Sequence, residues 1–303
     1  MSNHAPIVIF AYLRLDKLKN TINSLKQNEI SINSKLYIFS DGPKNKAEIP
    51  LVLAVRDYLS GITGFESITI KNYDEHKGLA VSIIEGVSHV INIHKKVIVL
   101  EDDLELSSNF LEYMNQSLHQ YENNEQVFSI SGYAFDLDKH TDLDGYFLNR
   151  AWSWGWATWY SRWNAVDWEV TSYKDFKINK PQKKRFALLG SDVNLMLKRQ
   201  MNSKLDSWLI RFIYQQFKVG GLTLYPTVSK VINNGWDKYA THNKGLGERF
   251  ATSLDNTNNS TFLFPNEIKI HHKYQHLFLR KNSLSARFYN KIKELLLLKF
   301  KEI

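Results

Sequence analysis

The first hundred residues alternate between short apolar runs and segments with helical spacing, and this alternation constrains the fold more than any other feature. Apolar runs typical of buried strands occupy residues 6–12, 36–39 and 96–100, and residues 67–70 also predict a strand. Apolar side chains at helical spacing predict helices between them, over residues 16–27, 48–59 and 79–93, the first with Asp16 as its N-cap. Strands and helices in this order predict an α/β fold with a mostly parallel central sheet, flanked by helices on both faces.

The second half of the chain is less regular. Its patterns predict helices over residues 108–121, 192–201 and 207–218, and strands over residues 127–131 and 222–232. A basic segment around residues 177–185 and a Gly- and Asn-rich loop over residues 233–247 are expected at the surface. Neither an internal repeat nor a low-complexity linker divides the sequence, so we expect one compact unit followed by a different tail.

The tail, residues 283–303, has the pattern of a basic amphipathic helix. Its apolar positions are Leu284, Phe288, Ile292, Leu295, Leu296 and Leu298, and Lys or Arg occupies positions 287, 291, 293, 299 and 301. Such a helix can lie on an anionic membrane surface. It can equally dock on the protein's own core, and the sequence leaves both interpretations open.

The composition limits the classes of function. A formal net charge of +8 suits an anionic partner, such as nucleotide phosphates, nucleic acid or an anionic membrane. No nucleic-acid-binding motif accompanies the charge, so a nucleic-acid partner is not expected. The chain has no cysteine, which excludes disulfides and thiolate chemistry. Neither a secretory signal nor a membrane-spanning apolar run is present in the sequence, so we expect a cytoplasmic protein, peripheral to the inner face of the membrane if the tail binds it.

Tryptophans gather in the middle of the sequence. The chain has eight, and four of them stand at positions 152, 154, 156 and 159. Indole rings line many sugar sites, because the apolar face of a pyranose stacks on an aromatic ring. Large aromatic side chains also fill protein cores, and the sequence does not decide between these two interpretations.

Three successive acids, Glu101, Asp102 and Asp103, directly follow the strand expected at residues 96–100. Buried carboxylates are costly unless a cation meets them. In α/β sheets, ligands sit at the carboxyl ends of the strands. Mg²⁺ and Mn²⁺ prefer carboxylate and phosphate oxygens, and such an ion makes a diphosphate a better leaving group. The pattern therefore favours a divalent metal site, with a solvated acidic turn as the alternative.

Residues 97–113, which contain these acids, resemble the nucleotide-sugar segment of the family of N-acetylglucosaminyltransferase I and related bacterial GT-A glycosyltransferases. Further segments resemble that family in the same order along the chain: Ala11–Arg14, Ser40–Gly42, Tyr73–Ala80, Trp154–Trp159 and Asp206–Trp208. The resemblance covers residues 5–245, and the ordered set of motifs makes it specific.

The resemblance implies a role for each matching residue. Asp103 would bind Mn²⁺ or Mg²⁺, and Glu101 and Asp102 would contact the donor's sugar and ribose. The remaining implied roles are donor contacts at Ala11, Tyr12 and Arg14, a uracil contact at Asp41, closure over the base by His76, Lys77 and Gly78, and acceptor contacts at Trp154, Trp156 and Trp208. Asp206 would be the catalytic base, although Asp is also a favoured helix N-cap. His242 would reach the metal or the diphosphate, or would be a surface-loop histidine.

Together these features predict an inverting, metal-dependent glycosyltransferase of the GT-A fold. The donor would be a nucleoside-diphosphate sugar, with UDP favoured by the resemblance. The acceptor would be a glycan or lipid-linked glycan, in the synthesis of a bacterial surface polysaccharide or lipopolysaccharide. The expected organisation is a catalytic unit over residues 1–280, divided into a nucleotide-binding half (1–105) and an acceptor-binding half (106–280), with a C-terminal helix over residues 281–303.

Two other functions are weighed against this prediction. A sugar nucleotidyltransferase usually has a Gly-rich phosphate loop after its first strand, whereas this sequence has Ala11-Tyr12-Leu13-Arg14-Leu15 there. A non-catalytic carbohydrate-binding protein would use the tryptophans but would need neither the acid triplet nor Asp206.

Overall fold

A computed structural model of the chain describes residues 4–236 and 248–301, and for residue 248 and residues 294–301 it describes the backbone alone. The first half alternates strands and helices as the sequence predicts. Its elements are β1 (Ile7–Ala11), α1 (Leu15–Lys26), β2 (Lys35–Ser40), α2 (Ile49–Ser60), β3 (Ser67–Asn72), α3 (Leu79–His94) and β4 (Lys96–Glu101). One detail of the prediction is wrong: Arg14 stands at the N-cap of α1, and Asp16 lies in the first turn, where its charge still suits the helix N-terminus.

The second half contains shorter elements. They are β5 (Leu104–Leu106), α4 (Phe110–Gln120), β6 (Val127–Ser131), β7 (Gly145–Leu148), β8 (Trp156–Trp159), α5 (Tyr160–Asn164), α6 (Tyr173–Ile178), α7 (Lys180–Phe186), α8 (Val193–Met201), α9 (Trp208–Val219), β9 (Leu222–Pro226), β10 (Val231–Asn233), α10 (His272–Lys281) and α11 (Leu284–Lys301). The strand predicted over residues 222–232 is two strands, β9 and β10, which belong to different sheets.

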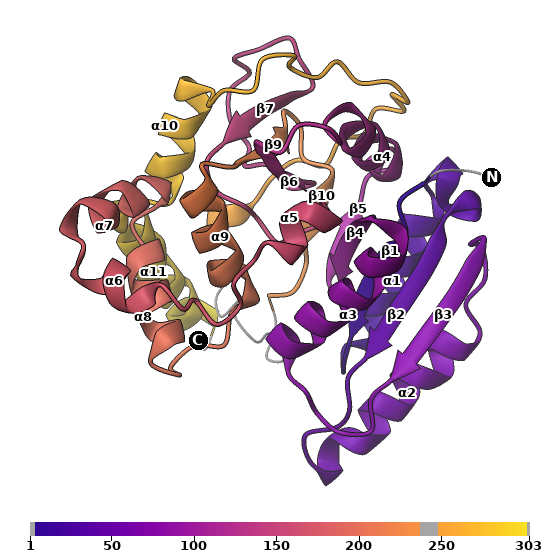
Figure 1. The fold of residues 1–303 in the computed structure, drawn as a ribbon. Helices are drawn as coiled ribbons and strands as arrows, with labels where there is room; N and C mark the ends of the chain where they lie inside the picture. The colour runs from indigo at the N-terminus through magenta and orange to yellow at the C-terminus, as the bar shows by residue number, and fades with distance from the viewer. Residues whose placement is uncertain (1–3, 237–247, 302–303) are drawn as a thin grey trace.

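The central sheet has eight strands in the order β3-β2-β1-β4-β8-β6-β9-β7. Strands β3, β2, β1 and β4 are parallel to one another. Strand β8 lies antiparallel between β4 and β6, and β7 is antiparallel to β9 at the far edge. Helices cover both faces of the sheet (Figure 1). The predicted α/β fold with a mostly parallel sheet is therefore confirmed.

The central strands β1, β2 and β4 contribute to two cores, one on each face of the sheet. In β1, Ile7 and Ile9 pack with α1 and α4 on one face, whereas Val8 and Phe10 pack with α3 on the other. This alternation follows from the two-residue period of side chains along a strand. Because both of their faces are buried, β1 and the interior of β4 are apolar throughout, and polar side chains gather where these strands end.

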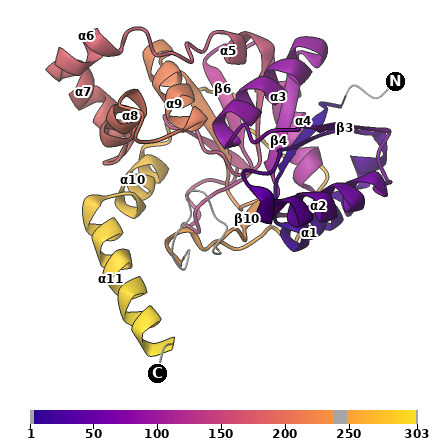
Figure 2. The ribbon, with the colours of Figure 1, turned by 90° about the horizontal axis from the view of Figure 1, so that it is seen from below.

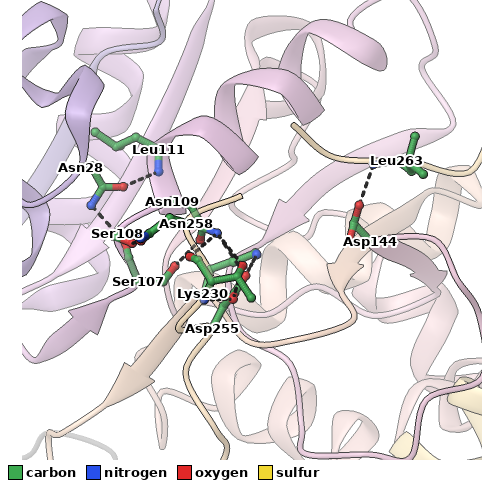
Figure 3. A network of polar contacts seen from close by, with 11 residues as sticks. Asn28, Ser107, Ser108, Asn109, Leu111, Asp144, Lys230, Asp255, Asn258 and Leu263 are labelled. Atoms are coloured by element: carbon green, nitrogen blue, oxygen red, sulfur yellow. Dashed lines mark hydrogen bonds and ion pairs between the residues drawn. The ribbon is translucent and has the colours of Figure 1, made fainter. Parts of the chain in front are cut away.

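A buried polar network fixes the segment that follows the acid triplet. Asn28 donates to the Ser107 carbonyl (3.1 Å) and accepts from the Leu111 amide (2.8 Å). The Lys230 ammonium pairs with the Asp255 carboxylate, which also accepts from Asn109 at 3.1 Å (Figure 3). Burying such a pair requires this close pairing. The network joins α1, α4 and the segment around residue 255, and so holds β5, directly after the acids, in one place.

The clustered tryptophans belong to the core. Trp156 is 1% exposed, and its ring stacks on those of Trp163 (centroids 5.6 Å apart) and Trp208 (4.7 Å). Trp154 is 7% exposed and packs edge-on against Tyr133 and Phe250. Trp154, Trp156 and Trp208 are each at most 7% exposed, which favours the core interpretation of the cluster. Their contacts to an acceptor stay a prediction.

The predicted C-terminal helix is present as α11, which extends away from the rest of the molecule (Figure 2). Leu284, Phe288, Tyr289 and Ile292 are exposed, so over this part the alternative of docking on the protein's own core is wrong. In the part of the chain that the structure describes, no helix has the length and apolarity needed to cross a bilayer.

Candidate active site

A cavity of about 740 Å³ opens at the carboxyl ends of β1, β2 and β4. The α3 N-terminus and the segment between α8 and α9 complete its wall. Many of the residues that the sequence singles out line it: Ala11, Tyr12, Arg14, Asp41, His76, Gly78, Glu101, Asp102, Asp103 and Asp206. Segments nearly two hundred residues apart in the sequence thus meet in one place, where strand-end ligand sites are expected.

The acid triplet forms one edge of the cavity. The Arg14 guanidinium contacts the Asp102 carboxylate and lies 2.9 Å from Asp103 Oδ2. Asn233, in β10, donates from its Nδ2 to Asp103 Oδ1 at 3.3 Å. A Cβ atom at position 235 would lie 1.9 Å from Asp103 Oδ2, so only glycine fits beside this carboxylate. The Asp103 side chain is therefore held firmly from several sides.

The acids carry more negative charge than Arg14 neutralises. Burial, with the neighbouring charge of Asp103, raises the pKa of Glu101 to about 8, against the opposing effect of Arg14. Burial likewise raises the pKa of Asp102 to about 6, although the nearby Arg14 guanidinium favours the carboxylate. An added cation at this edge would stabilise the ionised forms.

The residues at this edge fit a divalent cation that arrives with a phosphate. Among residues 4–236 and 248–301, no three His, Asp or Glu side chains are grouped to hold a metal on their own. Mg²⁺ and Mn²⁺ often bind through one or two carboxylates plus substrate phosphate oxygens, which needs no such cage. The excess negative charge supports this mode. The predicted ligand His242 lies outside the described residues.

A second corner of the cavity is built around Asp41, which follows β2. Its carboxylate accepts from the backbone amides of Lys77 (2.8 Å) and Gly78 (3.0 Å) and lies 2.9 Å from His76 Nδ1. A Cβ atom at Gly42 would lie 2.5 Å from the Glu75 backbone, so the two loops pack tightly. Asp41 thus fixes the turn that leads into α3.

An aromatic wall adjoins this corner. The rings of Tyr12 and His76 pack at a tilt of 31° with centroids 4.9 Å apart, and the Tyr12 hydroxyl donates to the Glu48 carboxylate. Burial, followed by the hydrogen bond to Glu48, raises the pKa of Tyr12. The Lys77 ammonium pairs with Glu85 and lies over the Tyr73 ring. Lys77 therefore contacts Asp41 through its backbone amide and not through its side chain.

Asp206 stands on the opposite wall, just before α9. Its side chain is 62% exposed, and its Oδ1 lies 3.5 Å from Arg211 Nη2. Its Oδ2 lies 4.0 Å from where a Cβ of Gly78 would be, so it faces the start of α3. The alternative role of Asp206 as N-cap is wrong, because Ser207 Oγ accepts from the Ile210 amide at 3.4 Å and caps the helix.

Several lining residues escaped the sequence analysis. Arg199 and Lys204 come from α8 and the turn that follows, and Ser82 comes from the second turn of α3. No local pattern marks them. The position of Arg199 and Lys204 shortly before Asp206 is a signal that could have suggested them.

No protein-family model matches the chain, and no curated protein matches it. Solved structures with a similar arrangement include a mannosyltransferase from Pyrobaculum calidifontis in complex with GDP-mannose and Mn²⁺ (10% identity, 52% of this chain and 45% of that chain, TM-score 0.35). Others are the galactosyltransferase LgtC in complex with donor and acceptor sugar analogues (12% identity, 73% and 72%, TM-score 0.36) and a Bacillus anthracis protein assigned as a glucose-1-phosphate thymidylyltransferase (11%, 76% and 89%, TM-score 0.39). At these TM-scores the likenesses carry no argument about this chain.

Proposed function

We propose that the chain is a glycosyltransferase of the GT-A type, which moves a sugar from a nucleoside-diphosphate donor to a glycan hydroxyl. One observation carries this proposal: a single cavity at the strand ends contains the acid triplet, the Asp41 corner and an exposed carboxylate, Asp206. The motif resemblance to the N-acetylglucosaminyltransferase I family supports a UDP-sugar donor carrying a hexosyl or N-acetylhexosaminyl group.

Donor binding divides between the two corners of the cavity. The Asp41 corner, with the Tyr12–His76 wall, would receive the base, and Glu101 and Asp102 would meet the ribose and sugar hydroxyls. Asp103 would hold a divalent ion, Mn²⁺ or Mg²⁺, together with the donor's phosphate oxygens. When bound, that ion neutralises the charge of the departing diphosphate.

Asp206 acts as the general base in this proposal. Its carboxylate takes the proton from the acceptor hydroxyl as that oxygen bonds to the anomeric carbon. The bond from the anomeric carbon to the diphosphate oxygen breaks at the same time, and the nucleoside diphosphate leaves with the electron pair. Attack opposite the leaving group inverts the anomeric configuration. The exposure of Asp206 suits a group that must reach an incoming acceptor.

Calorimetric titration of UDP, GDP and CMP, with and without Mn²⁺, tests the proposal. We expect Mn²⁺-dependent binding of one diphosphate, and that result also names the donor's nucleotide. Absence of binding to all three with Mn²⁺ present would contradict the proposal and favour a carbohydrate-binding protein. Release of pyrophosphate from a nucleoside triphosphate and a sugar phosphate would instead show a nucleotidyltransferase.

The helix α11 would bring the enzyme to a membrane that carries its acceptor. Its described apolar side chains are exposed, and Arg287, Lys291 and Lys293 add positive charge beside them. Such a face suits an anionic lipid surface on the cytoplasmic side, where lipid-linked glycans for surface polysaccharide or lipopolysaccharide are built. Deletion of residues 283–303 should reduce sedimentation with anionic vesicles but not with neutral ones. Equal sedimentation with anionic vesicles would rule out this role.

A further inference from the structure

The N-terminus of α3 faces into the cavity from the wall opposite the Arg199–Asp206 segment. Gly78, at the N-cap, has φ 81° and provides no side chain to cap the helix. The first bond of the helix runs from the Ser82 amide to the Gly78 carbonyl at 3.0 Å. The amides of residues 79–81 precede that bond, and such amides have no partner within a helix. Together with the helix dipole they favour an anion.

Ser82 gives a second, independent indication of a ligand at this place. Ser82 lines the cavity and is only 4% exposed. Its Oγ has no hydrogen-bond partner in the described part of the chain. A buried hydroxyl without a partner is unfavourable, because it has lost its hydrogen bonds to water. An oxygen-rich ligand at the cavity wall would remove that cost.

Two cations lie on the facing wall. Arg199 and Lys204 are exposed, line the same cavity, and form no ion pair within residues 4–236 and 248–301. The Lys204 amide donates to the Arg199 carbonyl at 2.8 Å, which keeps the two residues together. Asp206, two residues further on, approaches Gly78, so this segment stands close to the start of α3. Arg14 pairs with Asp102 and Asp103, and Arg211 lies near Asp206, so these acids are not paired with Arg199 or Lys204.

We infer that the α3 N-terminus, Ser82, Arg199 and Lys204 form a phosphate-binding subsite, distinct from the metal edge at Asp103. The subsite deepens the proposed function and rests on it for its source of phosphate. That source is either the donor's diphosphate or a phosphate group on the acceptor. In both cases the ligand carries phosphate oxygens that accept from backbone amides and a hydroxyl and pair with two cations.

The test is calorimetric titration of the full chain with inorganic phosphate in EDTA, which removes any contribution of a divalent metal, and with UDP and uridine in saturating Mn²⁺, which the proposed donor binding needs. The variants are S82A and the double variant R199Q/K204Q. Lys198→Gln is the matched control, because Lys198 is an exposed cation of the same helix that does not line the cavity. We expect phosphate affinity to fall about tenfold or more both in R199Q/K204Q and in S82A, as for hydrogen bonds to charged groups. The control should bind like the wild type.

The nucleotide probes identify the source of the phosphate. Weaker UDP binding with unchanged uridine binding in R199Q/K204Q would assign the subsite to the donor's diphosphate. Unchanged UDP binding, with weaker phosphate binding, would assign it to the acceptor. Phosphate affinity that is equal in all variants, or no phosphate binding by the wild type, would overturn the subsite. If the wild type binds phosphate but no nucleotide even with Mn²⁺, the proposed function fails while the subsite stands.

Discussion

The two walls of the cavity differ in how firmly their side chains are held. On the β4 edge, Asp103 is fixed by Arg14 and Asn233 and is crowded by Gly235. On the opposite wall, Arg199, Lys204 and Asp206 are exposed, and the Arg211 contact to Asp206 is long, at 3.5 Å. A fixed wall suits a ligand part that never changes, such as an ion and its phosphates. A loosely held wall suits a partner that enters and leaves in each cycle.

The substitution with the largest expected effect breaks the fixed wall. Asp103→Asn removes the carboxylate that would hold the ion, so Mn²⁺-dependent nucleotide binding should vanish and turnover should fall by about a thousandfold or more, in line with the several kcal/mol of charge stabilisation that a bound metal supplies. Titration and a sugar-transfer assay measure both quantities. Glu105→Gln is the control, since Glu105 is exposed beyond the cavity and its contact to Asn234 can persist. Normal Mn²⁺ dependence in Asp103→Asn would remove Asp103 from the metal site.

The second prediction concerns the exposed wall. Asp206→Asn keeps the size of the side chain but cannot accept a proton, so turnover should fall by about a hundredfold or more while nucleotide affinity is unchanged. Steady-state kinetics with the donor saturating measure this. The exposed Asp175, on α6 and outside the cavity, gives the control variant Asp175→Asn. Near-normal turnover in Asp206→Asn would show that another group is the base.

The third prediction uses the raised pKa values of the acid edge. Folding raises the pKa of Glu101 from 4.5 to about 8, so the folded state holds this proton more tightly than the unfolded state does. Its contribution to stability is present below the unfolded value and is lost as the pH rises through the folded value. In EDTA, the melting temperature should therefore fall by a few degrees between about pH 5 and 9, as expected for one shifted group in a domain of this size.

The substitution Glu101→Gln isolates this contribution, because it keeps the shape of the side chain and removes the titration. Differential scanning calorimetry across the same pH range should show a shallower fall in melting temperature than in the wild type. Saturating Mn²⁺ with nucleotide should reduce the fall as well, since the cation stabilises the ionised acids. Parallel curves for wild type and Glu101→Gln would contradict the raised pKa.

The smallest expected effect lies where the two walls meet. Gly78 has φ 81°, and a Cβ there would lie 4.0 Å from Asp206 Oδ2, which is ordinary contact. Gly78→Ala should therefore cost about 1–3 kcal/mol from backbone strain alone, because φ 81° with ψ 157° lies in a region essentially confined to glycine. Urea unfolding measures it, and Gly61→Ala, with a negative φ and space around it, is the control. Equal stability of Gly78→Ala and the wild type would show that the turn at residue 78 relaxes freely.

Local pattern was sufficient for the first half of the fold. The strands of residues 6–12 and 96–100 were predictable because they are continuous apolar runs, and the helix of residues 79–93 because its apolar side chains recur at helical spacing. The antiparallel β8 was missed, since its tryptophans fit a sugar platform as well as a core. Only packing decides between the two, and the burial of Trp156 against Trp163 and Trp208 does so.

The candidate site was predictable only in part. The acid triplet and Asp41 stand at strand ends, where position in the sequence indicates position in space. The pairing of Arg14 with Asp103 and the crowding by Gly235 join segments far apart in the chain, and no local pattern reports them. Ser82 lies within a mostly apolar helix, so the sequence does not mark it as a site residue. Its Oγ is buried without a hydrogen-bond partner in the described part of the chain, and only the three-dimensional structure shows this.

A co-crystal structure of the full chain with UDP and Mn²⁺ tests the central claim most directly, because it asks whether this cavity is the donor site. Our account predicts the ion against Asp103 and the diphosphate, with the base at the Asp41 corner and Asp206 facing the open side where an acceptor would enter. Nucleotide bound outside this cavity, or an ion held away from the acid triplet, would contradict it.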